Sequence, residues 1–300
     1  MPKPVVIHET VPAGAATPFS RAIAEVATAL KQAGFESIEI PSSWTRESDA
    51  EKTLRKLAHR PVPVTAVLCG YVHTSDDYSE LYAALAAKNL ILVNSPIEYV
   101  RCLSFAAAYP HLRGLTPESI IVRDVSEVAA AAWRLGFPLF IKGAVQSRKD
   151  KGWNACVANA VHEAQSHVTG LLNAYTYSEG AVILRKLVPL RHVAKRQDGF
   201  PIAREFRVIL YQDVPLGVGH YWPEEDPLAV LTEEEHATIC ELAIKASQQL
   251  RVPYLAVDIA QQENGSWTII ETGDPQTSGF AKINVPECIA KLAEKLGAME

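Results

Sequence analysis

The sequence has no apolar run that approaches the ~20 residues needed to span a bilayer. Its start, MPKP, lacks the apolar core of a signal peptide. These two absences predict a cytoplasmic protein without a membrane segment. The 300 residues suffice for one large domain or for two to three small ones with a sizeable core.

Cysteine is scarce and unpatterned. The cysteines are odd in number, widely spaced and without a Cys-x-x-Cys pair: Cys69, Cys102, Cys156, Cys240 and Cys288. This spacing indicates neither a zinc site nor a disulfide framework, so we expect reduced and mostly structural thiols.

An excess of positive charge is also missing. The formal net charge is −5, with 48% hydrophobic and 21% charged residues, which is ordinary for a soluble globular chain. Nucleic acid is therefore not an expected partner, although a local basic groove is compatible with this balance.

Residues 1–94 alternate short apolar segments with amphipathic ones, which predicts an amino-terminal α/β domain with a parallel sheet. Segments 5–8, 37–40, 64–69 and 90–93 are typical of strands. His73 follows the carboxyl end of one such strand, where ligands bind in doubly wound sheets. It is interpreted either as a substrate contact or as a surface histidine.

Residues 95–300 have a mixed α+β pattern that is rich in hairpins. Lys142 ends an apolar strand, and the loop 143–152 that follows contains Arg148, Lys149 and Lys151. A lysine at the end of a buried strand must reach water or an anion. The segment thus predicts a phosphate-binding loop that is mobile without nucleotide, or else a solvated basic turn above a lysine whose head reaches water.

A strand at 181–184 leads into Lys186 and Leu187, whose backbone groups are suited to hydrogen-bond an adenine edge. In the segment 204–210, Glu205 and Arg207 project from one face of a predicted strand while apolar residues occupy the other. This charged pair is either an internal ion pair or a grip on a transferring phosphate.

The most specific pattern is a predicted hairpin around Asn264-Gly265, the strongest short hairpin signal. A two-residue turn there places Asp258 directly opposite Glu271. Their Cβ atoms would lie roughly 4.5–5.5 Å apart, and like charges at that distance are destabilising unless a cation lies between them. We therefore predict a magnesium site, with Asp274 as a third oxygen ligand. A solvated acidic hairpin face is the alternative.

Taken in order, Lys142, the basic loop, the strand that ends near Leu187, Glu205-Phe206-Arg207, Asp258 and Glu271 resemble the ATP-grasp superfamily over residues 95–300. The resemblance implies an ATP-grasp fold in which two α+β subdomains clasp ATP behind an amino-terminal α/β domain. The nucleotide-binding residues that it implies are Lys142, Lys149, Lys151, Lys186, Leu187 and Glu205.

The resemblance also implies that Arg207 and Lys142 stabilise phosphoryl transfer and that Asp258 and Glu271 hold Mg²⁺. Two positions depart from the family pattern. Gly273 stands where the third metal ligand usually lies, with Asp274 one residue later, and Arg185 occupies the hinge.

By resemblance, the implied activity is that of an ATP-dependent carboxylate–amine ligase, which forms an amide or peptide bond through an acylphosphate and releases ADP. Its substrates would be small-molecule or peptide carboxylates and amines. Candidate substrate-binding residues are Arg191, Lys195, Arg196, Gln276 and Ser278. The basic stretch 191–196 is equally interpretable as a solvated connecting loop. Alternative functions are a kinase of a small molecule or protein, and a non-catalytic ATP-binding module.

Overall fold

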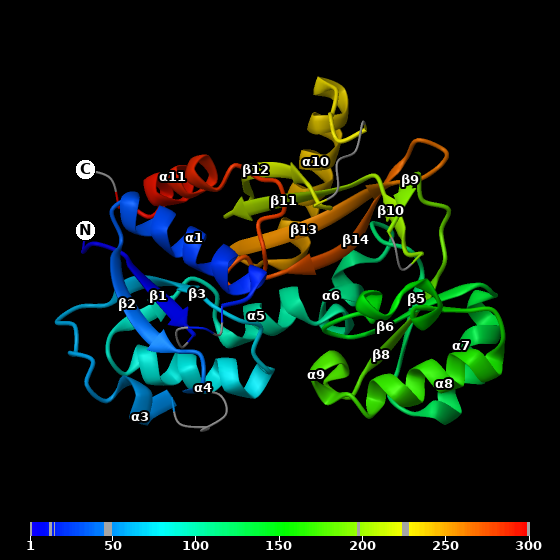
Figure 1. Cartoon of the computed structure of the whole chain (residues 1–300), viewed down its shortest axis with the longest axis horizontal. Helices are drawn as coiled ribbons and strands as arrows, with labels where there is room; N and C mark the ends of the chain where they lie inside the picture. Colours follow the sequence, from blue (N-terminus) through cyan, green and yellow to red (C-terminus); the bar gives the residue numbers. More distant parts are fainter. Residues whose placement is uncertain are drawn as a thin grey trace.

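The computed structural model describes residues 2–11, 14, 16–44, 50–196, 199–223 and 228–298, with only the backbone of Val193. Three four-stranded sheets form its framework (Figure 1). The expected α/β and α+β architecture is confirmed. Among the described residues, no helix combines the length and apolar character needed to cross a membrane.

The amino-terminal sheet is parallel, with the strand order β2-β1-β3-β4. Its elements are β1 Val5–Thr10, α1 Pro18–Gln32, β2 Glu36–Pro41, α3 Ala50–Leu54, β3 Val64–Cys69, α4 Ser75–Ala86 and β4 Leu90–Leu92. Both faces are covered, because Val5 and Ile7 pack toward α4 whereas Val6 packs toward α1. Buried residues on both faces are the pattern expected of a parallel sheet.

A second sheet, with the order β5-β8-β6-β7, is antiparallel in every pairing. Its strands are β5 Ser119–Val122, β6 Leu139–Gly143, β7 Val157–Ala158 and β8 Val182–Lys186. Helices α7 Val128–Leu135 and α8 Val161–Leu172 pack on it, and α9 Tyr175–Ser178 precedes β8. The short helices η1 Val125–Glu127, η2 Lys149–Lys151 and η3 Trp153–Ala155 lie in its connections. Helices α5 Pro96–Leu103 and α6 Phe105–Leu112 link it to the amino-terminal sheet (Figure 1).

The third sheet has the order β12-β11-β13-β14 and is also antiparallel. Its strands are β11 Glu205–Tyr211, β12 Val214–His220, β13 Tyr254–Gln261 and β14 Trp267–Gly273. The predicted alternation along β11 is confirmed: Phe206, Val208 and Leu210 pack against α10 Glu233–Leu250. Glu205 and Arg207 occupy the other face, toward the second sheet. A small hairpin of β9 His192–Lys195 and β10 Pro201–Ala203 precedes β11.

One hydrophobic core spans the amino-terminal sheet and the third sheet. The last helix, α11 Val285–Lys295, returns to lie beside α1 (Figure 1). Val6 and Leu30 share a buried cluster with Ile209, Tyr254 and Leu292. The predicted boundary at residue 94 therefore separates segments of sequence whose side chains are packed into a common core.

The β13–β14 hairpin does not have the predicted two-residue turn. Gly265 N–H donates to the Gln262 carbonyl (2.9 Å) and Gln262 N–H to the Ser266 carbonyl (2.8 Å), so the loop has three residues. Gly265 has φ +88°, which a glycine adopts without steric cost. Near the turn the register is consequently one residue away from the prediction.

A β-bulge at Ile270 restores the predicted register beyond it. The ladder shifts between Asp258 and Ile259, so that Ile259 pairs with Ile269 while Asp258 pairs with Glu271. The extra residue compensates for the longer turn. The predicted Asp258–Glu271 pair is thus present, but two opposite changes of register produce it.

Candidate active site

The first half of the site is an ion pair between β11 and β13. Arg207 lies opposite Asp258 in the ladder, and its Nε and Nη2 atoms each donate to a different carboxylate oxygen at 2.8 Å. Arg207 Nη1 also donates to the Gly279 carbonyl in the loop after β14. This two-point geometry holds the guanidinium rigidly.

The second half joins two sheets. Lys142, at the end of β6, donates from Nζ to Oε1 of Glu271 on β14, although 129 residues separate them. Lys142 is buried, with its ammonium 5.4 Å from the centre of the Phe105 ring. Burial alone would raise the pKa of Glu271, but the cations of Lys142 and Lys149 outweigh it and lower that pKa to about 2. Glu271 is therefore charged at neutral pH.

Asp258 and Glu271 are the oxygen-donor pair that the sequence predicted for magnesium. They are directly opposed in the ladder, on the same face of the third sheet. Two carboxylates on adjacent strands suit a hard cation, with phosphate oxygens to complete its shell. Each is balanced by a cation of the chain itself.

Asp274 is not brought to this pair. It is buried, and its oxygens accept hydrogen bonds from the Gln276 backbone (2.9 Å) and side-chain amide (3.0 Å). Burial raises the pKa of Asp274 to about 6. Within the described ranges, no three His, Cys, Asp or Glu side chains are grouped so that they could hold a metal. The predicted third ligand lies elsewhere because the chain turns into the protein interior after β14.

Gln276 is also placed away from a substrate. Its Oε1 accepts from Leu68 N–H (2.9 Å), and its Nε2 donates to the Tyr78 hydroxyl (3.0 Å) and to Asp274. These bonds tie the loop after β14 to the amino-terminal sheet and use the side-chain amide fully. The nearby Ser278 keeps its candidacy, since its Oγ is buried without a hydrogen-bond partner in the described structure.

The basic loop contributes one cation to the site instead of three. Lys149 Nζ lies 5.4 and 5.5 Å from the ring centres of Tyr221 and Trp222. Burial would lower the pKa of Lys149, but the fields of Tyr221, Glu205, Glu271 and Asp258 outweigh it and raise that pKa. The other two cations point elsewhere: Arg148 donates to the Gly170 carbonyl on α8, and Lys151 is exposed.

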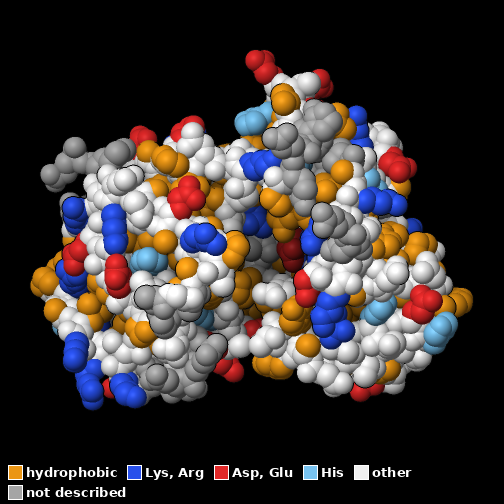
Figure 2. Space-filling model, in the orientation of Figure 1, with side chains coloured by type: hydrophobic (Ala, Val, Ile, Leu, Met, Phe, Trp, Pro, Cys, Tyr) orange, Lys and Arg blue, Asp and Glu red, His pale blue; other side chains and the backbone are white. Residues whose placement is uncertain are grey.

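A cavity of about 330 Å³ opens beside these charges. Its walls are mainly apolar and aromatic, and include Phe140, Trp153, Leu187, Val188, Phe200 and Trp222. Aromatic walls of this kind were not anticipated from the sequence, since they come from separate segments of the chain. Figure 2 shows the molecule hollowed near its middle, with acidic and basic side chains inside the hollow.

Unpartnered polar atoms belong to three residues that line this cavity. They are Nε and Nη2 of Arg185, Oε1 of Glu205 and Nε1 of Trp222, all buried without a hydrogen-bond partner in the described structure. Leaving such groups unpaired costs free energy, so each indicates a missing polar ligand. Sequence reasoning noted Arg185 only as a departure, and it missed Trp222.

Electrostatics distinguish two of these residues. Burial raises the pKa of Glu205 to about 7, with Asp258 and Glu271 adding to the effect and Lys149 opposing it. Burial lowers the pKa of Arg185 to about 10, still well above neutrality. The Arg185 guanidinium lies 4.2 Å from the Phe105 ring centre and donates to the Ile270 carbonyl (2.7 Å).

The hinge residues Lys186 and Leu187 line the cavity as predicted, but their N–H groups are already used. They donate to the carbonyls of Glu118 (2.8 Å) and Pro138 (3.3 Å). Any adenine contact from these two residues must therefore come from their carbonyl groups or from side-chain atoms.

The other predicted substrate residues lie on the β9–β10 hairpin. Arg191 donates to the Gln261 side chain (3.1 Å), Lys195 is exposed, and Arg196 begins the hairpin turn. His192 of the same hairpin lines the cavity. These cations thus lie on the side of the aromatic cavity, on a different element from Ser278.

His73 is neither on the surface nor in an open site. It is 5% exposed, its Nε2 is 3.0 Å from Glu9 Oε1, and its backbone N–H donates to the Tyr99 hydroxyl (3.0 Å). Trp44 donates to the same Glu9 carboxylate. The cluster is packed closed at the carboxyl ends of β1 and β3.

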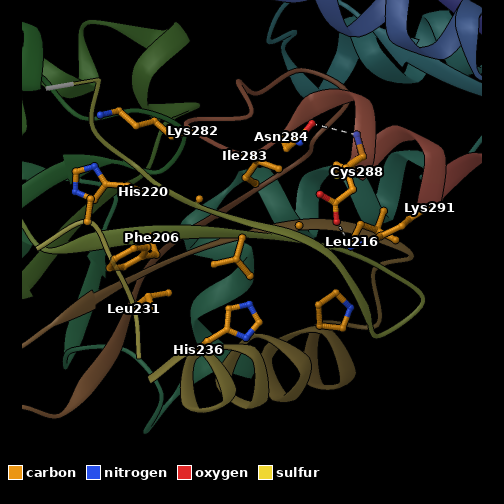
Figure 3. Close-up of a pocket in the computed structure, with 16 residues that line it drawn as sticks. Phe206, Leu216, His220, Leu231, His236, Lys282, Ile283, Asn284, Cys288 and Lys291 are labelled. Atoms are coloured by element: carbon orange, nitrogen blue, oxygen red, sulfur yellow. Dashed lines mark hydrogen bonds and ion pairs between the residues drawn. The ribbon is translucent and has the colours of Figure 1, made fainter. Parts of the chain in front are cut away.

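A second groove, of about 570 Å³, lies at the edge strand β12 between α10 and α11 (Figure 3). Leu216, His236 and Asn284 are among its lining residues. Its Lys291 is paired with Glu287 (2.8 Å). None of the residues predicted from the sequence as site residues lines this groove, and we assign the candidate site to the aromatic cavity.

The sequence matches the model of an ATP-grasp domain family, family 3 of its clade, over residues 129–292. The chain belongs to this family. The match begins within α7 and ends within α11, so it includes most of both clasping sheets and all the charged residues of the site described above. A comparison with curated proteins finds no significant match.

Solved structures share the ATP-grasp fold at low sequence identity. A RimK domain ATP-grasp protein from Sphaerobacter thermophilus has a TM-score of 0.59 and 19% identity, covering 96% of this chain and 98% of the other. The D-alanine–D-alanine ligase of Bacillus anthracis, complexed with ATP, has a TM-score of 0.62 and 13% identity over 91% and 85%. The ATP-grasp ligase PsnB, complexed with a precursor peptide and AMPPNP, has a TM-score of 0.57 and 14% identity over 97% of each chain.

Proposed function

We propose that this protein is an ATP-dependent carboxylate–amine ligase, which forms an amide or peptide bond through an acylphosphate and releases ADP. The observation that carries the proposal is the position of the aromatic cavity. Its unpartnered polar atoms lie next to two carboxylate–cation pairs that project from facing sheets. The first feature suits a nucleoside and the second its phosphates.

The cavity supports nucleotide binding by size and chemistry. Its volume of about 330 Å³ is within the usual range for small-ligand pockets. Aromatic walls stack on a planar base, while the Glu205 carboxylate accepts hydrogen bonds from ribose hydroxyls and Arg185 donates to ligand oxygens. Binding would satisfy groups that the protein alone leaves unpaired.

The charge of the site supports phosphate binding. Four cations, from Lys142, Lys149, Arg185 and Arg207, surround the fully charged pair of Asp258 and Glu271. Glu205 adds only part of a negative charge, since its pKa is about 7. The remaining positive charge suits a nucleoside triphosphate.

Magnesium held by Asp258 and Glu271 would bridge phosphate oxygens and neutralise charge that develops during transfer. Lys142 and Arg207, which pair with these carboxylates in the empty protein, would then donate to phosphate oxygens. Their work is positioning and electrostatic stabilisation, without a protein nucleophile. Closing the cavity would keep water from an acylphosphate.

The acceptor side of the proposal rests on the loop after β14. Arg207 donates to Gly279 in this loop, and Ser278 presents a buried hydroxyl without a partner in the described structure. The substrate carboxylate would meet the transferred phosphate here. Ligation is favoured over the kinase alternative because the named ligases with this fold include a D-alanine–D-alanine ligase and one complexed with a precursor peptide.

A screen for ADP release tests the proposal. Purified protein is supplied with MgATP and with amino acids, dipeptides or acidic peptides, and products are identified by mass. Hydroxylamine traps an acylphosphate as a hydroxamate, which a phosphoester does not form. Amide products and hydroxamate would support the ligase, whereas a stable phosphoester would favour the kinase. Tight ATP binding without turnover on any substrate would favour the non-catalytic module.

A further inference from the structure

Tyr221, the first residue after β12, contacts two cations of the site. Its ring centre lies 5.1 Å from the Arg207 guanidinium carbon and 5.4 Å from Lys149 Nζ. Both distances are within the ~6 Å reach of a cation–π interaction. One aromatic ring thus connects the basic loop of the second sheet to the arginine of the third.

The two cations differ in how they are held. Arg207 is fixed by Asp258 and by the Gly279 carbonyl. Across the described part of the chain, Lys149 Nζ has no hydrogen bond or ion pair, and it rests on the rings of Tyr221 and Trp222. The position of Lys149 therefore depends on these rings much more than that of Arg207 does.

The Tyr221 ring is itself firmly placed. Its backbone N–H donates to the Glu205 carbonyl (2.9 Å), which extends the β11–β12 ladder by one residue. Its ring meets the edge of the Trp222 ring at 5.2 Å, and Trp222 packs in turn against Phe200. The ring thus provides a fixed surface for the flexible lysine side chain.

We propose that Tyr221 is a positioning residue, whose ring holds Lys149 beside Arg207 so that both cations contact the same transferring phosphate. The proposal rests on the proposed function, because it assumes that the site binds MgATP. The ring attracts each cation through its quadrupole and shields both from water, which offsets their mutual repulsion before the phosphate arrives. The hydroxyl of Tyr221 has no part in this role.

The expected magnitude follows from the strength of a partly desolvated cation–π contact. Its loss in Tyr221→Leu should lower kcat/KM for MgATP by about 3- to 30-fold. Tyr221→Phe keeps the ring and should remain within about twofold of the wild-type protein. The matched control is Tyr175→Leu, an exposed tyrosine on α9 outside the site, which should leave kcat and KM unchanged.

Two further measurements separate positioning from folding. In a double-mutant cycle with Lys149→Met, Tyr221→Leu should have little additional effect, because the cation that it positions is already gone. Phenylalanines with increasing ring fluorination at position 221 should weaken MgATP affinity progressively, since fluorine removes the negative ring face while the shape is nearly preserved. This series applies even if Tyr221→Leu fails to fold.

Several results would overturn the inference. They are an undiminished effect of Tyr221→Leu in the Lys149→Met background, a loss in Tyr221→Phe equal to that in Tyr221→Leu, or affinity that is insensitive to fluorination. A wild-type protein that binds MgATP but forms no amide contradicts the ligase proposal alone, because nucleotide affinity still decides the role of Tyr221. Absence of any MgATP binding contradicts both.

Discussion

Arg207 and Asp258 face each other across neighbouring strands and are joined by two hydrogen bonds of 2.8 Å. The equivalent pair of Lys142 and Glu271 lies beside them. In the empty protein, the carboxylates proposed to bind magnesium are thus held by the cations proposed to bind phosphate. Each pair must exchange partners when both ligands arrive.

This exchange predicts that magnesium and ATP bind cooperatively. Magnesium alone would leave Lys142 and Arg207 without anions, and ATP alone would leave Asp258 and Glu271 without cations. We expect magnesium to increase ATP affinity by about tenfold or more, measured by calorimetry. Asp258→Asn should abolish this increase and the turnover, with the fold retained. Equal ATP affinity with magnesium and with chelator would contradict the exchange.

Lys142 and Arg207 are predicted to differ in their kinetic roles. Lys142→Ala removes a buried phosphate donor and should weaken ATP binding by about 10- to 100-fold. Arg207→Ala should lower kcat by about 10²–10³ and affect affinity less, because its contact strengthens as charge develops in transfer. Substrate titrations at saturating and limiting ATP separate the two effects. Equal losses in kcat and in affinity for both variants would refute the distinction.

Glu205 is predicted to make stability depend on pH. Its pKa in the folded protein, about 7, is above that of an exposed glutamate, so the folded state binds this proton more tightly. The resulting stabilisation is complete below the unfolded pKa and is lost as pH rises from about 4.5 to 7. Urea titrations across this window should show a steeper decline in unfolding free energy for the wild-type protein than for Glu205→Gln.

A control isolates the contribution of Glu205 from that of other groups. Glu241 is an exposed carboxylate on α10, and Glu241→Gln should follow the wild-type pH dependence. If Glu205→Gln and Glu241→Gln gave the same slope as the wild-type protein, burial of the Glu205 carboxylate would not be linked to folding.

The basic loop is predicted to respond to nucleotide only in its second half. The N–H groups of Val145 and Gln146 both donate to the Tyr177 carbonyl at 3.0 Å, so they should be protected from hydrogen exchange even without ligand. Residues 148–152 contain Lys149 and should become protected with magnesium and a non-hydrolysable ATP analogue. Exchange at 148–152 that stayed unchanged with bound nucleotide would remove Lys149 from the phosphate site.

The sequence by itself determined the kind and facing of the principal strands. A period-2 pattern is local, so it placed Glu205 and Arg207 on the polar face of β11 and Phe206 on the buried face. The ladder pair of Asp258 and Glu271 was also predicted correctly, although the turn was not. A one-residue bulge cannot be read from periodicity, because it depends on how the finished sheet twists and packs.

Tertiary structure alone decided which charges meet. Lys142 reaches Glu271, Lys149 reaches Tyr221 and Asp274 turns into the interior because separate sheets and loops pack together, and no local pattern encodes those distances. The aromatic cavity arises in the same way, from segments that become neighbours only in the folded chain. Sequence thus determined the elements and their polar faces, whereas three-dimensional packing determined the ion pairs, the cavity and the ligand groups left unpaired.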